Sequence, residues 1–451
     1  MQTFSVRSDC NSDVQTREDL SVRSTLNSDR IHRLNEKLRC LETLPSSPCN
    51  RNNLILHDSA DLSFGDGNAL LMTWGLFLKE DIAKTTILPD KCVSCVNYPL
   101  DFCFPIRIAP SDRRFRRLDC LIMPRSNTVC RSATGMREQL NENTAFVDGS
   151  MLYGSSDRDL SYVRTKGGKI QGDKIHHTNG FVAALYVIFQ REHNRVSGRL
   201  QQINPHWDND RVFQETRKIV GAEIQHLETS PYRGYNSSLN PTLSNEFTTS
   251  AFRFGQITQN LSVSKAMDSI NTLLNQGPDP TLRDKFPSFM DVYARNIQRG
   301  RDHGIPSYNQ MRKFCGRSKL RSFSIDFQRE LASMATGMFH RLYGHPDNID
   351  FYVGRLVEDP IENAVVGPTF ACILAREFKR LRDGDRFWFE NDRVFSRGQV
   401  NQLRKTSLAR VLCDNADATT HVPRKAFLVR SKTTLVECNT LPFTNLRAWK
   451  E

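Results

Sequence analysis

Several features are scarce or missing in this sequence of 451 residues. No run of about 18 apolar residues occurs, so no segment is expected to span a membrane. Alternating stretches of Val, Ile, Tyr and Thr are rare, which argues against an all-β fold. No internal repeat, low-complexity tract or nucleic-acid-binding motif is found, so neither a repeat array nor a DNA- or RNA-binding protein is indicated.

The composition is that of a globular protein with a basic surface. Hydrophobic residues make up 38% of the chain and charged residues 25%. The formal net charge of +12 favours acidic partners such as sulfated glycans, anionic matrix proteins, acidic lipid or nucleic acid. Acidic residues are nevertheless interleaved with the basic ones in 112–120 (DRRFRRLDC) and 376–386 (REFKRLRDGDR), so a merely solvated basic surface is an alternative interpretation.

Twelve cysteines indicate an oxidising compartment, and we expect the protein to be secreted. Asn236 begins a glycosylation sequon in a polar stretch (YNSSLNPT), where a surface loop is expected, and Asn260 begins a weaker one. Residues 1–14 lack the apolar segment of a signal peptide. Either the true N-terminus is missing or the export route is unusual.

Apolar residues recur at helical spacing along much of the chain, so the fold class is mainly α. The segment 180–203 begins almost wholly apolar and is expected to be a central helix. Residues 90–135 are rich in cysteine and proline and are expected to be disulfide-stapled loops. The further helices are expected at 67–82, 209–227, 262–275, 287–297, 307–316, 324–343, 369–382 and 397–411.

Seven long motifs follow one another between residues 71 and 391. They are LMTWGLFLKEDI (71–82), NTAFVDGSMLYGSS (143–156), LYVIFQREHNRV (185–196), ETRKIVGAEIQHL (215–227), FTTSAFRFGQIT (247–258), NIQRGRDHGIPSYNQMRKFCG (296–316) and REFKRLRDGDRFWFEN (376–391). In sequence and order they resemble the animal haem peroxidase family, the group of peroxidasin, myeloperoxidase and thyroid peroxidase. The resemblance covers roughly residues 65–450.

The resemblance implies the animal haem peroxidase fold, a large single helical domain over residues 61–451 with long disulfide-stapled loops and little β. Residues 1–60 match the family poorly and are expected to form an N-terminal arm. The family's pairing of neighbouring cysteines implies four disulfides here: Cys92–Cys103, Cys95–Cys120, Cys315–Cys372 and Cys413–Cys438. The remaining cysteines stay unassigned: Cys10, Cys40, Cys49 and Cys130.

On the proximal side of the haem, the family places an axial imidazole on the iron. Its motif Phe-Arg-(Phe/Tyr)-Gly-His corresponds here to residues 252–256, with Gln256 in place of the histidine. An amide is a much weaker iron ligand than imidazole. Arg253, whose counterpart faces a haem propionate, is kept, and Asn348 matches the asparagine that orients the proximal histidine.

On the distal side, the family uses a histidine base, an arginine and two carboxylates that form esters with the haem. The alignment puts Glu80 at the distal base, Lys79 at the first ester-forming carboxylate, Ile175 at the distal arginine and Thr178 at the second carboxylate. With Gln256, five functional positions are replaced, so no catalytic residue is expected and haem binding is in question.

Two pairs of histidines are candidates for a haem-binding or a structural role. His176 and His177 could supply a displaced haem ligand, although adjacent histidines in a polar loop are usually solvated. His193 and His303 lie in motifs that the family keeps for packing and hydrogen bonding, so a structural role is expected for both. Glu80 could in principle act as a base.

The same resemblance implies that a calcium site is retained. Its ligands would be Asp81, Thr144, Phe146, Asp148 and Ser150, where alternate residues of an extended loop direct oxygens to one side. Two carboxylates, two hydroxyls and backbone carbonyls suit a hard cation that takes six to eight oxygen ligands. The alternative is that the loop merely caps the next helix.

The sequence therefore predicts a secreted peroxidase-like pseudoenzyme with bound calcium, which acts by binding, with acidic extracellular-matrix components as its partners. The first alternative is a divergent haem-dependent peroxidase that uses hydrogen peroxide, with Glu80 as base and another axial ligand. The second is a defective or wrongly assembled gene product. The sequence indicates no nucleic-acid partner and no oligomeric state.

Overall fold

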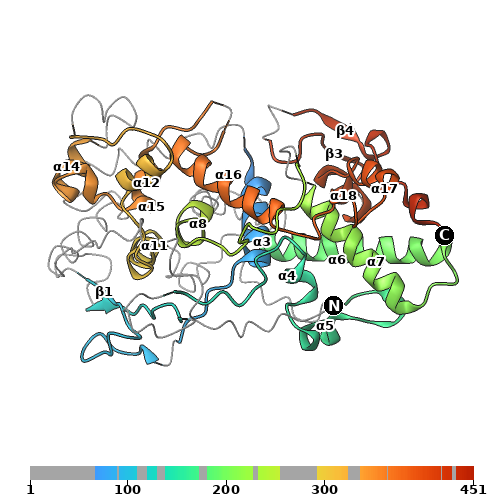
Figure 1. Ribbon diagram of the computed structural model, residues 1–451, viewed down its shortest axis with the longest axis horizontal. Helices are drawn as coiled ribbons and strands as arrows, with labels where there is room; N and C mark the ends of the chain where they lie inside the picture. Colours follow the sequence, from blue (N-terminus) through green and yellow to red (C-terminus); the bar gives the residue numbers. More distant parts are fainter. Residues whose placement is uncertain are drawn as a thin grey trace, which may run out of the picture.

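The computed structural model describes residues 67–88, 91–108, 119–128, 138–171, 180–226, 232–253, 292–323, 336–362, 364–417, 419–428 and 433–451. These ranges are mainly helical, as expected, and their β structure is limited to two short antiparallel sheets and isolated bridges. Figure 1 shows an elongated molecule with α11 to α15 at one end and α6, α7, α17 and α18 at the other. In the described part, no helix is both long and apolar enough to cross a membrane.

The bounds of the elements are as follows. The longer helices are α3 (Ala69–Ile82), α5 (Asp157–Val163), α6 (Gly180–Ile203), α7 (Asn209–Gln225), α11 (Val292–Asp302), α12 (Tyr308–Phe314), α14 (Thr336–Tyr343), α15 (Phe351–Val357), α16 (Pro368–Asp383), α17 (Arg397–Leu403) and α18 (Leu408–Asn415). The shorter ones are α4 (Ser150–Tyr153), η4 (Lys166–Gly168), α8 (Asn245–Thr249), η5 (Ala251–Arg253), η8 (Pro346–Asn348), η10 (Cys438–Thr440) and η11 (Leu446–Trp449). The strands are β1 (Ile106–Arg107), β2 (Cys120–Leu121), β3 (His421–Pro423) and β4 (Leu435–Glu437).

The core is centred on α6, which packs against α3, α7 and α18. Asn68 caps α3, because its side chain accepts hydrogen bonds from the first free backbone N–H groups of the helix. Trp74 and Phe77 then face Phe189 of α6, and the Phe77 and Phe189 rings stack with centroids 5.2 Å apart. All three side chains are buried, so α3 is fixed along α6 by aromatic packing.

Most of the expected helices are present, and two of them differ from the expectation. The helix expected at 287–297 runs to Asp302 in α11, and Gly304 follows it with a φ of 67° that suits a residue without a side chain. The single helix expected at 397–411 is two helices, because α17 ends at Leu403 and Ser407 caps α18 with its hydroxyl. The helix expected at 324–343 is described only from residue 336, and 262–275 lies outside the described residues.

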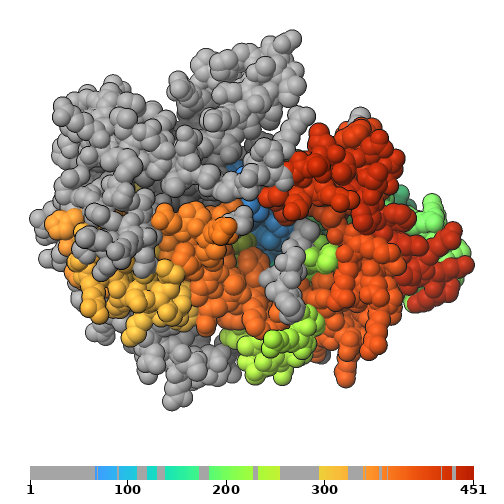
Figure 2. Space-filling view, turned by 90° about the horizontal axis from the view of Figure 1, so that it is seen from above, coloured from blue at the N-terminus to red at the C-terminus, as the bar shows by residue number. Residues whose placement is uncertain are grey.

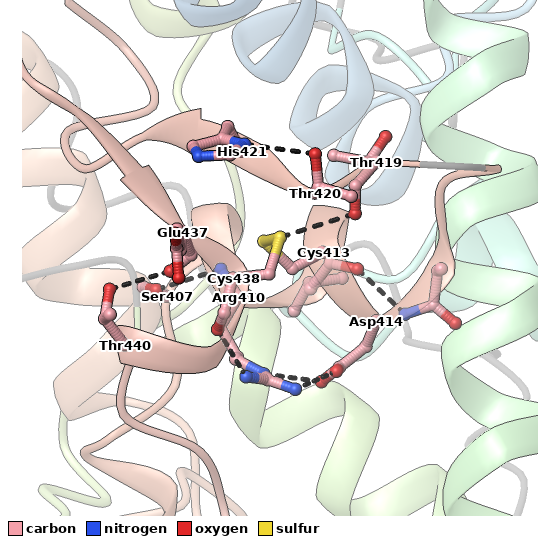
Figure 3. Close-up of a disulfide and its surroundings, with 12 residues drawn as sticks. Ser407, Arg410, Cys413, Asp414, Thr419, Thr420, His421, Glu437, Cys438 and Thr440 are labelled. Carbon is pink, nitrogen blue, oxygen red and sulfur yellow. Dashed lines mark hydrogen bonds and ion pairs between the residues drawn. A yellow bond between two sulfur atoms is a disulfide. The ribbon is translucent and has the colours of Figure 1, made fainter.

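The four cysteine pairs implied by the resemblance are joined in the structure: Cys92–Cys103, Cys95–Cys120, Cys315–Cys372 and Cys413–Cys438. Two of them staple the loops around β1 and β2, and the third ties the end of α12 to α16. Figure 3 shows the fourth, which joins α18 to the β3–β4 hairpin, with Arg410 donating to the carbonyl of Cys438 at 2.9 Å. The other four cysteines lie outside the described residues.

Candidate functional site

The expected calcium ligands are brought together at the end of α3. Asp81 lies in its last turn, and its Oδ1 accepts a hydrogen bond of 3.0 Å from the Ser150 hydroxyl. In the loop itself, the Thr144 hydroxyl and the Ser150 backbone N–H both donate to Asp148 Oδ1, at 3.1 and 2.9 Å. Asp81 and Ser150, which meet at this point, are 69 positions apart in the sequence.

Asp81 of α3 and Asp148 of the loop lie close enough for their charges to interact, with Asp81 buried and Asp148 half-buried. Asp81 is fully buried, and burial together with the charge of Asp148 raises the pKa of Asp81 to about 8. Burial is also the main cause that raises the pKa of Asp148, against the opposing influence of Arg217. Two carboxylates in this position repel one another, and a divalent cation between them would remove both the repulsion and the desolvation cost.

Neighbouring side chains hold the loop in place. The Gln225 side chain of α7 donates to the Val147 carbonyl at 2.8 Å, and Asn143 donates to the Glu80 carbonyl at 2.6 Å. Gly149 has a φ of 74°, and a Cβ there would come within 3.0 Å of the Tyr153 ring. Gly149 is therefore required both by its backbone conformation and by its close packing.

The donor set suits calcium better than a transition metal. Among the described residues, no three His, Cys, Asp or Glu side chains gather as a metal cluster. The site offers two carboxylates with hydroxyl and carbonyl oxygens, the ligands of a hard cation. The residues present thus fit calcium.

The positions that the resemblance assigns to the distal base and to an ester-forming carboxylate are occupied by an ion pair. Lys79 Nζ lies 2.9 Å from Glu80 Oε1, and both side chains are a little over one third exposed. The rest of the expected distal site, Ile175 and Thr178, lies outside the described residues, as do His176 and His177.

On the proximal side, Arg253 ends the short helix η5. Burial, and then the nearby charge of Arg299, lower the pKa of Arg253 to about 10. Asn348 lies in η8, where its amide donates to the Tyr343 carbonyl at 3.0 Å, so its N–H group is engaged with backbone. Gln256 lies outside the described residues.

The comparisons with known proteins agree with this geometry. The sequence model of animal haem peroxidases matches residues 27–179, 170–288 and 279–427, beginning within the segment expected to be an arm. Peroxidase skpo-1 of Caenorhabditis elegans is 34% identical over 86% of this chain and 68% of its own length. The chain belongs to the animal haem peroxidase family.

Other members of the family are longer than this chain. Peroxidase mlt-7 of Caenorhabditis elegans is 35% identical over 88% of this chain and 66% of its own length, and the mouse peroxidasin homolog is 33% identical over 85% of this chain and 34% of its own length. The chain thus spans about two thirds of the first and one third of the second. The alignment with mlt-7 runs over 484 positions, more than the whole of this chain, so the relative has residues at many positions where this chain has none.

Solved structures share the fold. Peroxidase A of Dictyostelium discoideum superposes with a TM-score of 0.64 at 24% identity, over 81% of this chain and 87% of its own. A fatty acid alpha-dioxygenase of Oryza sativa reaches 0.60 at 17% identity, over 81% of this chain and 77% of its own. At these identities the likeness concerns the fold alone.

Two histidines in animal haem peroxidase motifs have structural partners here. His193 is fully buried, and its Nε2 donates to the Gly168 carbonyl at 2.9 Å, so its Nδ1 accepts the Tyr153 hydroxyl. Burial lowers the pKa of His193 to about 4, which keeps the ring neutral. His303 likewise bonds to Ser126 at 2.6 Å and to Asn245 at 2.9 Å. Both rings connect separate segments of the core.

One buried acidic cluster was not found by reasoning from the sequence. Glu192 and Glu223, on α6 and α7, are at most 2% exposed, and Arg195 bonds both oxygens of Glu192 at 2.8 and 2.5 Å. Burial first, and then the charge of Glu192, raise the pKa of Glu223 well above its usual value. Both residues are on amphipathic helices. The helical period was therefore a signal that could have predicted their place on the inner face.

Proposed function

We propose that the protein is a secreted member of the animal haem peroxidase family with impaired haem chemistry and a retained calcium site, and that it acts by binding in the extracellular matrix. The observation that carries the proposal is the 2.9 Å ion pair between Lys79 and Glu80. Where the family has a neutral imidazole beside a carboxylate, this chain has a carboxylate held by an ammonium group. That arrangement leaves Glu80 poorly placed to take a proton from hydrogen peroxide.

The expected haem ligands add to this argument. Gln256 offers an amide in place of the imidazole, and Ile175 offers no charge in place of the guanidinium. Asn348 donates to the Tyr343 carbonyl, and the histidine that its family counterpart orients is replaced here by Gln256. Arg253 could still attract a haem propionate, but the residues present do not supply the ligand and ester groups of a working haem site.

Calcium binding is supported by the geometry of the loop. The buried Asp81 and the half-buried Asp148 have raised pKa values, and the hydroxyls of Thr144 and Ser150 donate to their carboxylates. Phe146 would contribute its carbonyl oxygen, as the resemblance implies. Bound calcium would join α3 to the loop before α4 and would have a structural role.

Secretion and a matrix partner rest on covalent and electrostatic features. Four disulfides in the described residues are typical of an extracellular protein. Asn236 is exposed, and its side-chain oxygen accepts from the Ser238 hydroxyl at 2.7 Å within the sequon, which suits a glycosylated surface turn. The net charge of +12 favours an acidic partner.

A divergent haem-dependent peroxidase is the second candidate. It is favoured by the retained Arg253 and by the carboxylate of Glu80, which could act as a base if Lys79 moved away. Relatives that carry the name peroxidase belong to the same family. This candidate requires an axial ligand other than Gln256.

A haem titration separates the two candidates. We expect the purified protein to bind haem weakly and to show no Soret band typical of six-coordinate or histidine-ligated haem. We also expect it to oxidise a phenol with hydrogen peroxide no faster than free haem does. Stoichiometric binding with turnover above free haem would contradict the impaired-enzyme proposal.

Two variants sharpen this test. Gln256→His alone should improve haem binding and leave turnover near the level of free haem, because the distal base and cation are still missing. Adding Glu80→His and Ile175→Arg to Gln256→His should raise turnover further, by about 10² or more. A working peroxidase from Gln256→His alone would show that the distal side is intact.

A further inference from the structure

A short stretch after α12 carries only positive charge. Between Asp302 and Asp326 the sequence has no acidic residue and five basic ones: Arg312, Lys313, Arg317, Lys319 and Arg321. In 376–386, by contrast, basic residues alternate with acidic ones. Residues 393–413 also lack acidic residues, but Arg404 there pairs with Glu390 and Arg410 with Asp414.

The fold holds this stretch rigidly. Asn309, fully buried, binds both backbone groups of Leu320, accepting at 2.7 Å and donating at 2.8 Å. The buried Arg312 donates to the Ser318 carbonyl at 2.9 Å. The Cys315–Cys372 disulfide fixes the other end to α16. The loop conformation is therefore set before any partner binds.

Four cations project from this frame. Lys313, Lys319, Arg321 and Arg376 are all exposed. Arg376 belongs to α16, and its guanidinium lies 4.6 Å from the centre of the Phe314 ring, so it adjoins the loop. In Figure 2 the gold surface that includes residues 313–321 lies next to the orange surface of α15 and α16. We call Lys313, Lys319, Arg321 and Arg376 the basic loop site.

Among the residues that the structure describes, one acidic side chain pairs with a member of the site. Lys319 Nζ lies 3.7 Å from Asp347 Oδ1, a long contact between two side chains that are each more than two fifths exposed. Asp347 also accepts from the Asn309 amide at 2.8 Å, which holds it at the base of the loop. An exposed pair at this distance is weak, so a multiply charged anion could displace it.

The chemistry of the site favours one class of polyanion. Leu320 is buried, and none of the strongly exposed apolar side chains of the described residues lies between 313 and 321, so nothing there would enter a bilayer. Phe314 is covered by Arg376, so no free ring is offered for stacking on a nucleic-acid base. The Cys315–Cys372 disulfide is typical of an extracellular protein, in agreement with the proposed function.

We propose that the basic loop site binds a sulfated polysaccharide. Sulfate groups stay charged at every physiological pH, and their spacing along a flexible chain lets several contact the fixed cations together. This inference rests on the proposed matrix function and gives it a partner class and a site. It does not depend on haem or on calcium.

The test measures binding of the full chain to immobilised heparin. Lys313→Gln, Lys319→Gln and Arg321→Gln together should weaken binding about tenfold at physiological salt, since each exposed contact contributes a few tenths of a kcal/mol or more. The control removes three exposed charges elsewhere, Arg158→Gln, Lys166→Gln and Lys169→Gln, so that both proteins have the same net charge. The control should bind nearly as the unchanged protein does.

Two further measurements complete the design. Hyaluronan, which carries carboxylates but no sulfate, should bind more weakly than heparin. On the unchanged protein, heparin should protect Lys313 and Lys319 from acetylation but leave Lys166 and Lys169 reactive. This footprint gives a result even if the triple variant fails to fold.

Several results would overturn the inference: equal losses in the two triple variants, equal protection of all four lysines, or hyaluronan binding as tight as heparin. Binding to phosphatidylserine vesicles or to DNA that depends on the basic loop site and exceeds heparin binding would also overturn it. Failure to bind heparin leaves the haem titration unaffected, and efficient peroxide turnover would refute the proposed function without altering the heparin result.

Discussion

At the scale of single residues, the groups expected to be structural have partners in the fold. His193, His303 and Asp81 retain partners within the buried interior, with bonds between 2.6 and 3.0 Å. Lys79 and Glu80, on the same helix as Asp81, instead pair with each other near the surface. Asp81 therefore belongs to the buried hydrogen bonds of the loop, while its two neighbours on the helix lie near the surface.

The buried Glu223 gives a prediction at this scale. Its pKa is raised in the folded protein, so its protonated form stabilises the fold, and this stability is present at low pH and is lost as the pH rises from about 4.5 through the folded pKa. Glu223→Gln is neutral at every pH. Relative to the unchanged protein, we expect the variant to become more stable between pH 5 and pH 8, by up to about 1.4 kcal/mol per pH unit in that window.

Urea unfolding at several pH values checks this prediction at a fixed calcium concentration. Glu215→Gln, on the same helix and paired with Lys218, is the control. Parallel pH curves for Glu223→Gln and the unchanged protein would show that Glu223 is ionised in the folded state.

At the scale of elements, the loop before α4 is linked to α3 by Asp81 and to α7 by Gln225. These contacts join segments that the helical pattern of the sequence does not relate to one another. A cation bound by Asp81 and Asp148 would strengthen the same connection, and its removal should loosen all three elements together.

Calcium removal tests this connection. If the free calcium concentration before chelation is one hundred times the dissociation constant for calcium, chelation should lower the free energy of unfolding by about 2.7 kcal/mol. Asp148→Ala should lower stability in calcium and remove most of the effect of chelation. Asp359→Ala, at an exposed site, is the control and should respond to chelation as the unchanged protein does. Identical melting curves with calcium and with chelator would count against the site.

At the scale of the whole molecule, disulfides link segments that no single helix could hold together. The Cys315–Cys372 bond closes a loop of 57 positions and connects α12 to α16. The Cys92–Cys103 bond spans 11 positions within one loop region. Longer loops lose more entropy in the unfolded chain when they are closed, so the two bonds should differ in their effect.

Paired serine substitutions measure that difference. Replacing Cys315 and Cys372 should cost about 4 kcal/mol in the chain-entropy model, against about 3 kcal/mol for Cys92 and Cys103. Thermal or denaturant unfolding under non-reducing conditions gives both values. A larger loss for the shorter loop would mean that contacts in the folded state, and not loop length, decide the outcome.

The sequence by itself determined the fold class, because seven motifs of one family occur in order and the apolar period marks α3, α6, α7 and α16. Through that resemblance it also predicted the four disulfide pairs, which are confirmed, and the calcium ligands, which stay a prediction. Four short helices, α4, α5, α8 and α15, were not expected, since segments of four to seven residues carry too few apolar positions to show a period. The break between α17 and α18 was missed for a similar reason.

Only the tertiary structure decided how distant side chains meet. It placed Ser150 on Asp81 and Glu223 beside Glu192, and it fixed the basic loop through Asn309. Each of these depends on the packing of separate elements and on the burial that follows. Burial changes the cost of a charge, and a linear sequence does not state which charges are buried.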